Sequence, residues 1–230
     1  MSGRIHFIGT IHSDPQGKER LARALGYEKP DLITVESSKE VIEYIEQEAL
    51  PLMKQKVDSL GFYPEVAEYL KEELVKLNYE IEVSRNYARE HTIPLSYVDH
   101  PSKLENTKLE VISFCHSSKA NFDYHLSSLN KRIAIPIADK EYQTFQSLFD
   151  KSFAEAEAEE KKIVDKEAHL FDHRDIFMAK NIEAVLRSGK LVHVGGIAHC
   201  LQDTFDLRTL FSRLQKYAPT RATLKWYENR

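Results

Sequence analysis

A chain of 230 residues is long enough for one sizeable domain, or for one core that carries a large insertion. Its hydrophobic content of 42% and charged content of 30% are typical of an ordinary globular protein, and its net charge of -4 disfavours a dedicated nucleic-acid-binding protein, whose binding face is usually basic. No apolar run approaches the roughly 20 residues that a membrane-spanning helix needs, so we expect no membrane span.

The N-terminal part of the chain predicts two strands joined by a helix. Arg4–Thr10 is a short apolar run that predicts a buried strand. A helix is expected over Gln16–Leu25, with Gly26 as its C-terminal cap, and a second strand over Asp31–Glu36. Because β-α-β units usually place their strands in parallel, these two strands predict a parallel sheet.

The next part of the chain is predicted to be helical. From Lys39 to His91 the apolar residues recur with helical spacing, and Gly61 and Pro64 divide the pattern into two segments. Pro94–Asp99 then predicts a third strand. The apolar helices between Lys39 and His91 offer a surface on which a homodimer could form.

Residues 102–173 show the least regular pattern, and we interpret them as a covering insertion or lid. Val111–Phe114 and Ile133–Ile135 are expected to be extended, although Pro136, which directly follows the second segment, disfavours a central strand there. Glu141–His169 is rich in Glu, Ala and Lys and predicts a solvated helix.

The C-terminal part returns to strands and helices in alternation. A helix is expected over Asp172–Leu186, followed by a buried strand that starts at Leu191. A further helix is predicted near Gln202–Lys216, and a final strand over Arg221–Tyr227.

These elements together predict an α/β fold with a mainly parallel central sheet flanked by helices. We expect one domain over residues 1–230, with helical insertions around residues 39–92 and 102–173. The apolar run at the N-terminus is broken by Gly9 and His12, so it does not read as a secretory signal. Cys115 and Cys200 form no CxxC pair, which fits a reducing compartment, and we expect a cytoplasmic protein.

Two strands far apart in the sequence end in the same way. Ile5–His12 and Leu191–His199 each run apolar, break at glycine and then present a histidine. The second and third predicted strands end in Glu36 and Asp99. Because parallel α/β sheets gather functional groups at the carboxyl ends of their strands, we expect these side chains to share one site.

Two imidazoles with one or two carboxylates are a mixed nitrogen and oxygen donor set that suits Zn, Mn, Co or Fe. We therefore predict a divalent metal bound by His12, Glu36 and His199, with Glu36 acting either as a ligand or as a general base. Arg174 is expected to stabilise the oxyanion of a tetrahedral intermediate. A metal at such a site activates water, which is the chemistry of hydrolysis. Thr10, Ser13 and Asp14 are candidates for orienting the ligands.

Each of these residues also has a purely structural interpretation. His12 and His199 can be surface or capping residues, Glu36 can cap the next helix, and Asp99 can make a turn before His100. Arg174 can be a solvated residue of a first helical turn. We expect His6 and His193 to be packed or edge histidines within strands, and Cys200 to be a small buried residue. Cys115 and His116 have no third partner at a recognisable spacing, so we assign them no site.

The paired motifs resemble those of the TraB/PrgY/GumN/TIKI superfamily. The resemblance lies in Gly9–His12, in Gly196–His199, in the strand that ends at Glu36, and in the helix Arg174–Ala179. It implies a metal-dependent hydrolase, a peptidase that uses Mn or Co, with His12, Glu36 and His199 at the metal and Arg174 at its edge. Asp99 is a looser match, because His100 follows it where family members often have arginine.

Three functions remain open from the sequence. The first is a hydrolase that acts on a peptide or a small molecule with the help of Mn, Co or Zn. The second is a non-catalytic module that binds or sequesters a peptide on the same scaffold. The third is a metal-dependent phosphoesterase, which would cleave phosphoesters and leave peptides intact.

Overall fold

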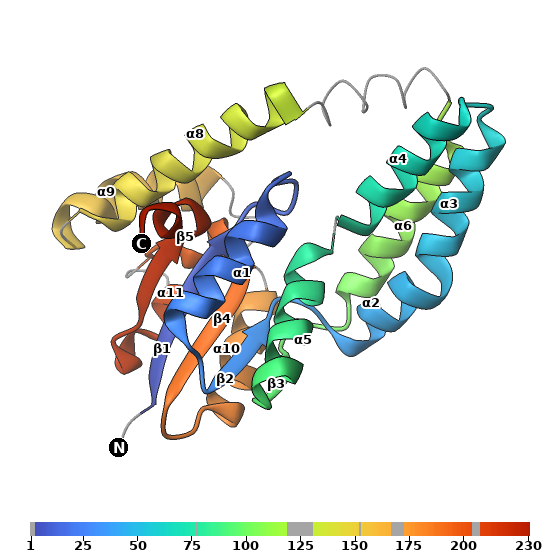
Figure 1. The fold of residues 1–230 in the computed structure, drawn as a ribbon. Coiled ribbons are helices and arrows are strands. Elements are labelled where there is room, and N and C mark those ends of the chain that lie inside the picture. Colours follow the sequence, from blue (N-terminus) through green and yellow to red (C-terminus); the bar gives the residue numbers. More distant parts are fainter. Residues whose placement is uncertain (1–2, 77, 119–130, 152, 167–172, 204–207) are drawn as a thin grey trace.

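The protein contains one five-stranded parallel sheet covered by helices on both faces (Figure 1). The structure is a computed structural model, and it describes residues 3–76, 78–118, 131–151, 153–166, 173–203 and 208–230. The strands lie in the order β3-β2-β4-β1-β5 and every pair is parallel, which confirms the predicted α/β fold. Their bounds are Arg4–Thr10 (β1), Leu32–Val35 (β2), Leu95–Tyr97 (β3), Lys190–Gly196 (β4) and Thr220–Thr223 (β5).

The two ends of the chain meet at the centre of the sheet. Strand β1 pairs with β4 along its whole length, so that Gly9 lies opposite Gly195 and Thr10 opposite Gly196. The hydroxyl of Thr10 also donates a hydrogen bond of 3.0 Å to the carbonyl oxygen of Gly195. The glycine breaks that precede His12 and His199 are therefore neighbours in space.

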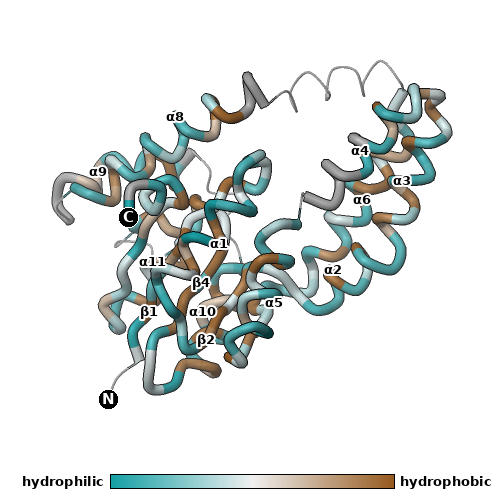
Figure 2. Tube along the Cα trace, viewed as in Figure 1, coloured by the Kyte–Doolittle hydropathy of each residue, from teal (hydrophilic) through white to brown (hydrophobic). Residues whose placement is uncertain are grey.

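Each face of the sheet has its own apolar core, because successive side chains of a strand point to opposite faces. In β1, Ile8 packs with α1 (Gly17–Glu28), α5 (Tyr79–His91) and α8 (Lys131–Phe149). Phe7 points the other way and packs with α10 (His173–Val185) and α11 (Leu210–Arg213). Figure 2 shows apolar residues concentrated along the strands, between these two helical layers.

A group of helices extends from the sheet after β2, as predicted for residues 39–92 (Figure 1). Helix α2 (Lys39–Tyr44) continues through a π-helical segment, η1 (Ile45–Ala49), into α3 (Leu50–Ser59). Pro51 lies in the first turn of α3 and has no amide hydrogen to donate, and the wider π turn before it accommodates this missing bond. Helices α3 and α4 (Pro64–Lys76) pack on each other around Val57, Ala67 and Leu70.

The predicted extended pieces within residues 102–173 are helical in the structure. Val111–Phe114 belongs to α6 (Lys103–His116), and Ile133–Ile135 belongs to α8. The prediction was wrong at Val111 because a short β-branched run conceals a longer helical spacing, in which Lys103, Thr107, Val111 and Phe114 line the same pocket. The expected solvated helix is divided into the end of α8 and α9 (Phe153–Lys166), and residues 167–169 lie outside the described part.

Three further boundaries differ from the predictions. Helix α1 continues through Gly26 and ends at Lys29, whose φ of 48° provides the left-handed cap. The helix expected over Gln202–Lys216 is reduced, among the described residues, to α11 and the 3-10 turn η4 (Gln215–Tyr217). Strand β5 ends at Thr223, where a 3-10 segment, η5 (Leu224–Asn229), begins and turns Tyr227 into the core.

The helix predicted over Asp172–Leu186 is confirmed from His173 onward, and Asp172 lies outside the described residues. After β4, the 3-10 segment η3 (Ile197–Cys200) carries the second motif histidine. No described helix combines the length and the apolar content that a membrane span requires.

Candidate active site

The predicted site residues lie at the carboxyl edge of the sheet. His12 follows β1, Glu36 follows β2, Asp99 follows β3 and His199 lies in η3 directly after β4. Arg174 reaches the same edge from the first turn of α10. In the structure, Arg174 and His199 both contact Glu36, and His12 lies near Gly196.

His199 is buried between two carboxylates. Its Nδ1 lies 2.6 Å from Oδ1 of Asp175, and its Nε2 lies 3.3 Å from Oε1 of Glu36. Burial by itself would lower the pKa of His199, but the two carboxylates outweigh it and raise that pKa to about 10. The imidazole is therefore held by Asp175 and turned with Nε2 toward Glu36.

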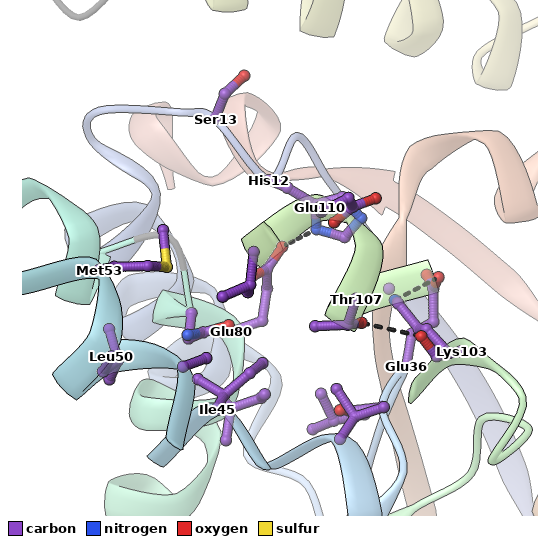
Figure 3. A pocket seen from close by; sticks show the side chains of 18 of the residues that line it. His12, Ser13, Glu36, Ile45, Leu50, Met53, Glu80, Lys103, Thr107 and Glu110 are labelled. Carbon is purple, nitrogen blue, oxygen red and sulfur yellow. Dashed lines mark hydrogen bonds and ion pairs between the residues drawn. The ribbon is translucent and has the colours of Figure 1, made fainter. Parts of the chain in front are cut away.

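His12 has a similar arrangement on a more open part of the site. Its Nδ1 donates a hydrogen bond of 2.6 Å to Oε1 of Glu80, whereas 57% of its side chain is exposed (Figure 3). Desolvation lowers the pKa of His12 and the bond to Glu80 raises it, and the net shift is upward. Each motif histidine thus pairs its Nδ1 with a carboxylate, an arrangement that is common for histidines whose other nitrogen binds a metal.

Gly196 marks the space that these side chains share. A Cβ atom at this position would lie 3.3 Å from Oε2 of Glu36, 3.4 Å from Nε2 of His12 and 3.6 Å from Cδ2 of His199. Any larger residue would occupy this space, so glycine keeps it open between the two imidazoles and the carboxylate.

Glu36 accepts hydrogen bonds on both oxygens. The amide of Gly196 donates to Oε2 at 2.6 Å, and Nη2 of Arg174 donates to Oε1 at 2.7 Å. Burial would raise the pKa of Glu36, but the charges of His199 and Lys103 hold it well below its ordinary value. The carboxylate is therefore ionised and fixed in orientation.

Arg174 joins two of the strand ends. Its Nε donates to Oδ1 of Asp99 at 3.0 Å and its Nη2 donates to Oδ2 at 2.6 Å, in addition to the bond to Glu36. Lys103, at the start of α6, places Nζ 3.6 Å from both Glu36 and Asp99 and remains 29% exposed at its side chain. The planar guanidinium of Arg174 and the ammonium group of Lys103 thus contact the same two carboxylates from two different helices, α10 and α6.

Three of the site residues were not anticipated from the sequence: Glu80, Lys103 and Asp175. Glu80 and Asp175 lie in the first turns of α5 and α10, two helices that lead into strands. Such helices run antiparallel to the strand that follows, so they begin at the carboxyl edge of the sheet. An acidic residue in the first turn of a helix that precedes a strand could therefore have indicated Glu80 and Asp175 as site residues. The sequence contains no comparable indication for Lys103.

Several other candidates have different roles in the structure. Asp14 does not contact His12; it accepts hydrogen bonds from Arg20 and from the amide of Gln16. Cys200 is buried in the core beneath α10, where burial raises the pKa of its thiol. His6 and His193 are buried within β1 and β4, whereas Ser13 lines the pocket beside His12.

A pocket of about 440 Å³ opens from this edge of the sheet toward the helical group. In Figure 3, His12, Glu36, Glu80 and Lys103 lie at one side of it. The remainder is lined largely by apolar side chains of η1, α3 and α6. The polar cluster therefore adjoins a deep apolar space.

The described residues contain no group of three or more His, Cys, Asp and Glu side chains already arranged to hold a metal ion. Glu36 instead contacts Arg174 and Lys103. Four basic side chains face four carboxylates around Gly196, since the pKa values of both imidazoles are raised: His12, Lys103, Arg174 and His199 against Glu36, Glu80, Asp99 and Asp175.

Gly195 provides a test of how closely this site is packed. A Cβ atom there would lie 2.8 Å from Nε2 of His193 and 3.0 Å from Oε2 of Glu36, and both side chains are buried. We expect Gly195→Ala to lower the free energy of unfolding by about 1–3 kcal/mol, because the added methyl group has no space. Urea denaturation measures this change.

Gly26 supplies a matched control for the same substitution. It lies within α1, and a Cβ atom there would meet nothing within 4 Å. Gly26→Ala is expected to raise stability by up to about 1 kcal/mol, because alanine favours helix more than glycine does. Equal effects of the two substitutions would contradict the packing described for Gly195.

Comparison with models of known protein families, with curated proteins and with solved structures finds no match to this chain. The function is therefore argued from the arrangement of the site.

Proposed function

We propose that the protein is a cytoplasmic hydrolase of the TraB/PrgY/GumN/TIKI type, dependent on a divalent metal, that cleaves peptide bonds. The observation that carries this proposal is the meeting of two carboxylate-paired histidines and one ionised glutamate around Gly196. Mixed imidazole and carboxylate donors of this kind suit Mn, Co or Zn.

The donor set fits such an ion in chemistry. His12, Glu36 and His199 would hold it, because the Nδ1 atoms of both histidines are already paired with carboxylates. Nε2 of His12 borders the space at Gly196, and Nε2 of His199 would exchange its contact with Glu36 for the ion. Binding would require the imidazoles to release their protons and Glu36 to exchange its contacts with Arg174 and Lys103. When bound, the ion would lower the pKa of a water molecule from about 15.7 toward about 7 and polarise a carbonyl group.

The other residues act by orientation and charge. Asp175 and Glu80 hold the two imidazoles, and Arg174 positions Glu36 and Asp99 relative to each other. Lys103 lines the pocket, so its ammonium group is placed to stabilise negative charge that develops on a substrate carbonyl oxygen. Glu36 serves as a ligand or accepts the proton of the attacking water.

The proposal is tested by metal uptake and hydrolysis measured on the same preparations. Protein purified without chelator or affinity tag is dialysed against Mn²⁺, Co²⁺ or Zn²⁺, analysed for bound metal, and assayed with a mixture of quenched fluorescent peptides. We expect metal binding and peptide cleavage, and a loss of at least about tenfold in metal affinity for His12→Ala and for His199→Ala.

His116→Ala is the matched control, because His116 is exposed near the end of α6 and lies outside the pocket. It should bind metal and cleave peptides as the unchanged protein does. Failure of the unchanged protein to take up metal, or unchanged uptake when His12 and His199 are both replaced, would overturn the proposal.

One observation favours a second candidate, a module that binds a peptide without cleaving it. Arg174 and Lys103 already contact Glu36, and this arrangement can persist without a metal. This candidate predicts peptide binding that is independent of divalent ions and unaffected by His199→Ala. A phosphoesterase has less support, because the pocket is lined by Glu36, Glu80 and Glu110 against one lysine.

A further inference from the structure

The pocket beside the candidate active site has two chemically distinct ends (Figure 3). One end carries His12, Glu36 and Lys103, and the other is formed by the helical group that follows β2. Its volume of about 440 Å³ lies within the usual range of small-molecule sites. A ligand that fills this pocket therefore places one part against the polar cluster and another part in the helical end.

The helical end is aliphatic. In Figure 3, Ile45, Leu50 and Met53 project into the pocket from η1 and α3. The apolar wall is completed by further side chains of η1 and α6: Ala49, Val111 and Phe114. Among the described lining residues, Phe114 carries the only benzene ring, so the pocket offers little of the stacking surface that nucleobases and sugars generally use.

The charges that line the pocket disfavour an anionic ligand. Glu36, Glu80 and Glu110 line it together with two basic side chains, Lys103 and His12, which already contact Glu36 and Glu80 respectively. Bringing a phosphate or carboxylate into this space would oppose the acidic side chains and would also remove a charge from water. An uncharged group avoids both costs.

Building on the proposed hydrolase, we propose that this pocket receives a large uncharged aliphatic group on the acyl side of the scissile bond. With the aliphatic group against Met53 and Leu50, the carbonyl lies at the end that holds His12, Glu36 and Lys103. In the reaction, water oxygen bonds to the carbonyl carbon and the bond from that carbon to the leaving nitrogen or oxygen breaks. One proton of water passes to the leaving group, so the products are a carboxylic acid and an amine or alcohol.

The aliphatic group has two possible sources, which share this chemistry. It is either an unbranched acyl chain or the side chain of an apolar amino acid such as leucine or methionine. Both would bury methylene and methyl groups against the same wall, and each buried methylene tightens binding by several-fold.

The binding part of the proposal is tested without any catalytic step. Butanamide, hexanamide and octanamide are uncharged probes that differ only in chain length, and calorimetric titration measures their affinities. We expect roughly a tenfold gain for each pair of added methylene groups, the fold-change that follows from burying an alkyl chain.

Two neighbouring residues of α3 provide a blocked variant and its control. Met53 lines the pocket, so Met53→Trp should fill it and abolish the dependence on chain length. Leu52 is 47% exposed on the outer side of the same helix, so Leu52→Trp introduces the same side chain outside the pocket and should leave binding unchanged. The assignment would be overturned if the unchanged protein did not bind octanamide, or if Met53→Trp still bound it.

Hydrolysis assays with Mn²⁺ distinguish the two sources. Octanoyl p-nitroanilide is compared with acetyl p-nitroanilide, and acetyl-leucine p-nitroanilide with acetyl-alanine p-nitroanilide. A higher kcat/KM for the larger member of either pair, lost in Met53→Trp and kept in Leu52→Trp, supports the proposal and identifies the source. Binding of octanamide without hydrolysis of any substrate would reject the hydrolase and leave the aliphatic site, whereas hydrolysis without a size preference would reject the aliphatic site alone.

Discussion

Replacing Arg174 by methionine is expected to lower the free energy of unfolding by about 3–5 kcal/mol, because it removes the guanidinium that bonds both buried carboxylates and leaves them only the longer contacts to Lys103. Asp99 is fully buried at its side chain, and Glu36 is 4% exposed. Arg174 donates two hydrogen bonds to the first and one to the second. Urea denaturation near neutral pH, where both carboxylates are ionised in the unfolded chain, measures the loss.

A surface arginine pair provides the control for this prediction. Arg85 contacts Glu46 at 2.7 Å, as Arg174 contacts Glu36, but the side chains of Arg85 and Glu46 are 43% and 50% exposed. Arg85→Met should therefore cost no more than about 1 kcal/mol. If Arg174→Met were no more destabilising than Arg85→Met, the prediction would be wrong. Water would then have to solvate Asp99 and Glu36 in place of the guanidinium.

The stability that Arg174→Met loses through unpaired charge can be separated from the stability that it loses through poorer packing. If the unpaired charge of Asp99 is responsible, Asp99→Asn should restore part of the stability that Arg174→Met removes. Arg174→Lys should have an intermediate effect, because an ammonium keeps the charge but not the planar fork that contacts both carboxylates. A double variant that is less stable than both single variants would contradict this explanation.

Acidification is expected to destabilise the protein through His6. Burial lowers the pKa of His6 from 6.5 to about 4, despite the opposing effect of Glu28. The unfolded chain therefore takes up a proton near pH 6.5 that the folded protein does not accept until about pH 4. The contribution of His6 is fully present above the unfolded pKa and is lost as the pH falls through this window, by up to about 3 kcal/mol in total.

The neutral state of His6 follows from its hydrogen bonds. The hydroxyl of Tyr227 donates to Glu28 at 2.7 Å, so it can only accept from Nε2 of His6, which lies 2.6 Å away. Nδ1 of His6 then accepts from the hydroxyl of Thr220 at 2.7 Å, on the neighbouring strand. Lys190 contacts Glu28 from β4, and its positive charge further opposes protonation of His6.

The prediction is checked by the slope of stability against pH. The free energy of unfolding is measured in urea from about pH 7 to about pH 4.5 for the unchanged protein and for His6→Gln. Stability should fall less steeply in His6→Gln, which cannot take up the proton. His116→Gln, at an exposed histidine, should keep the original slope, and the same slope in all three proteins would show that His6 does not titrate differently on folding.

The position of the motif residues could be predicted because it depends on the local sequence pattern of each strand and on the rule that parallel strands end at the same edge of a sheet. His12, Glu36, Asp99 and His199 each follow a short strand, and the parallel strands end at one edge of the sheet. The position of these residues at one edge therefore follows from local periodicity.

The pocket could not be anticipated in the same way. Val111–Phe114 looks extended when only four residues are considered, yet Val111 and Phe114 share a helical face with Lys103 and Thr107. The apolar wall contributed by Ile45 and Met53 comes from a helix interrupted by a π turn, and no sequence pattern placed it opposite α6.

From the amino-acid sequence alone, the α/β class and the common edge of the two histidine motifs followed, because strand and helix periods are set by neighbouring residues. Only the tertiary structure decided that Asp175 and Glu80 hold the imidazoles, that Arg174 and Lys103 neutralise Glu36, and that an aliphatic pocket opens beside them. Many acidic and basic side chains have suitable positions in the sequence. Which of them pair depends on how helices distant in the chain pack, since an ion pair requires contact within a few ångströms.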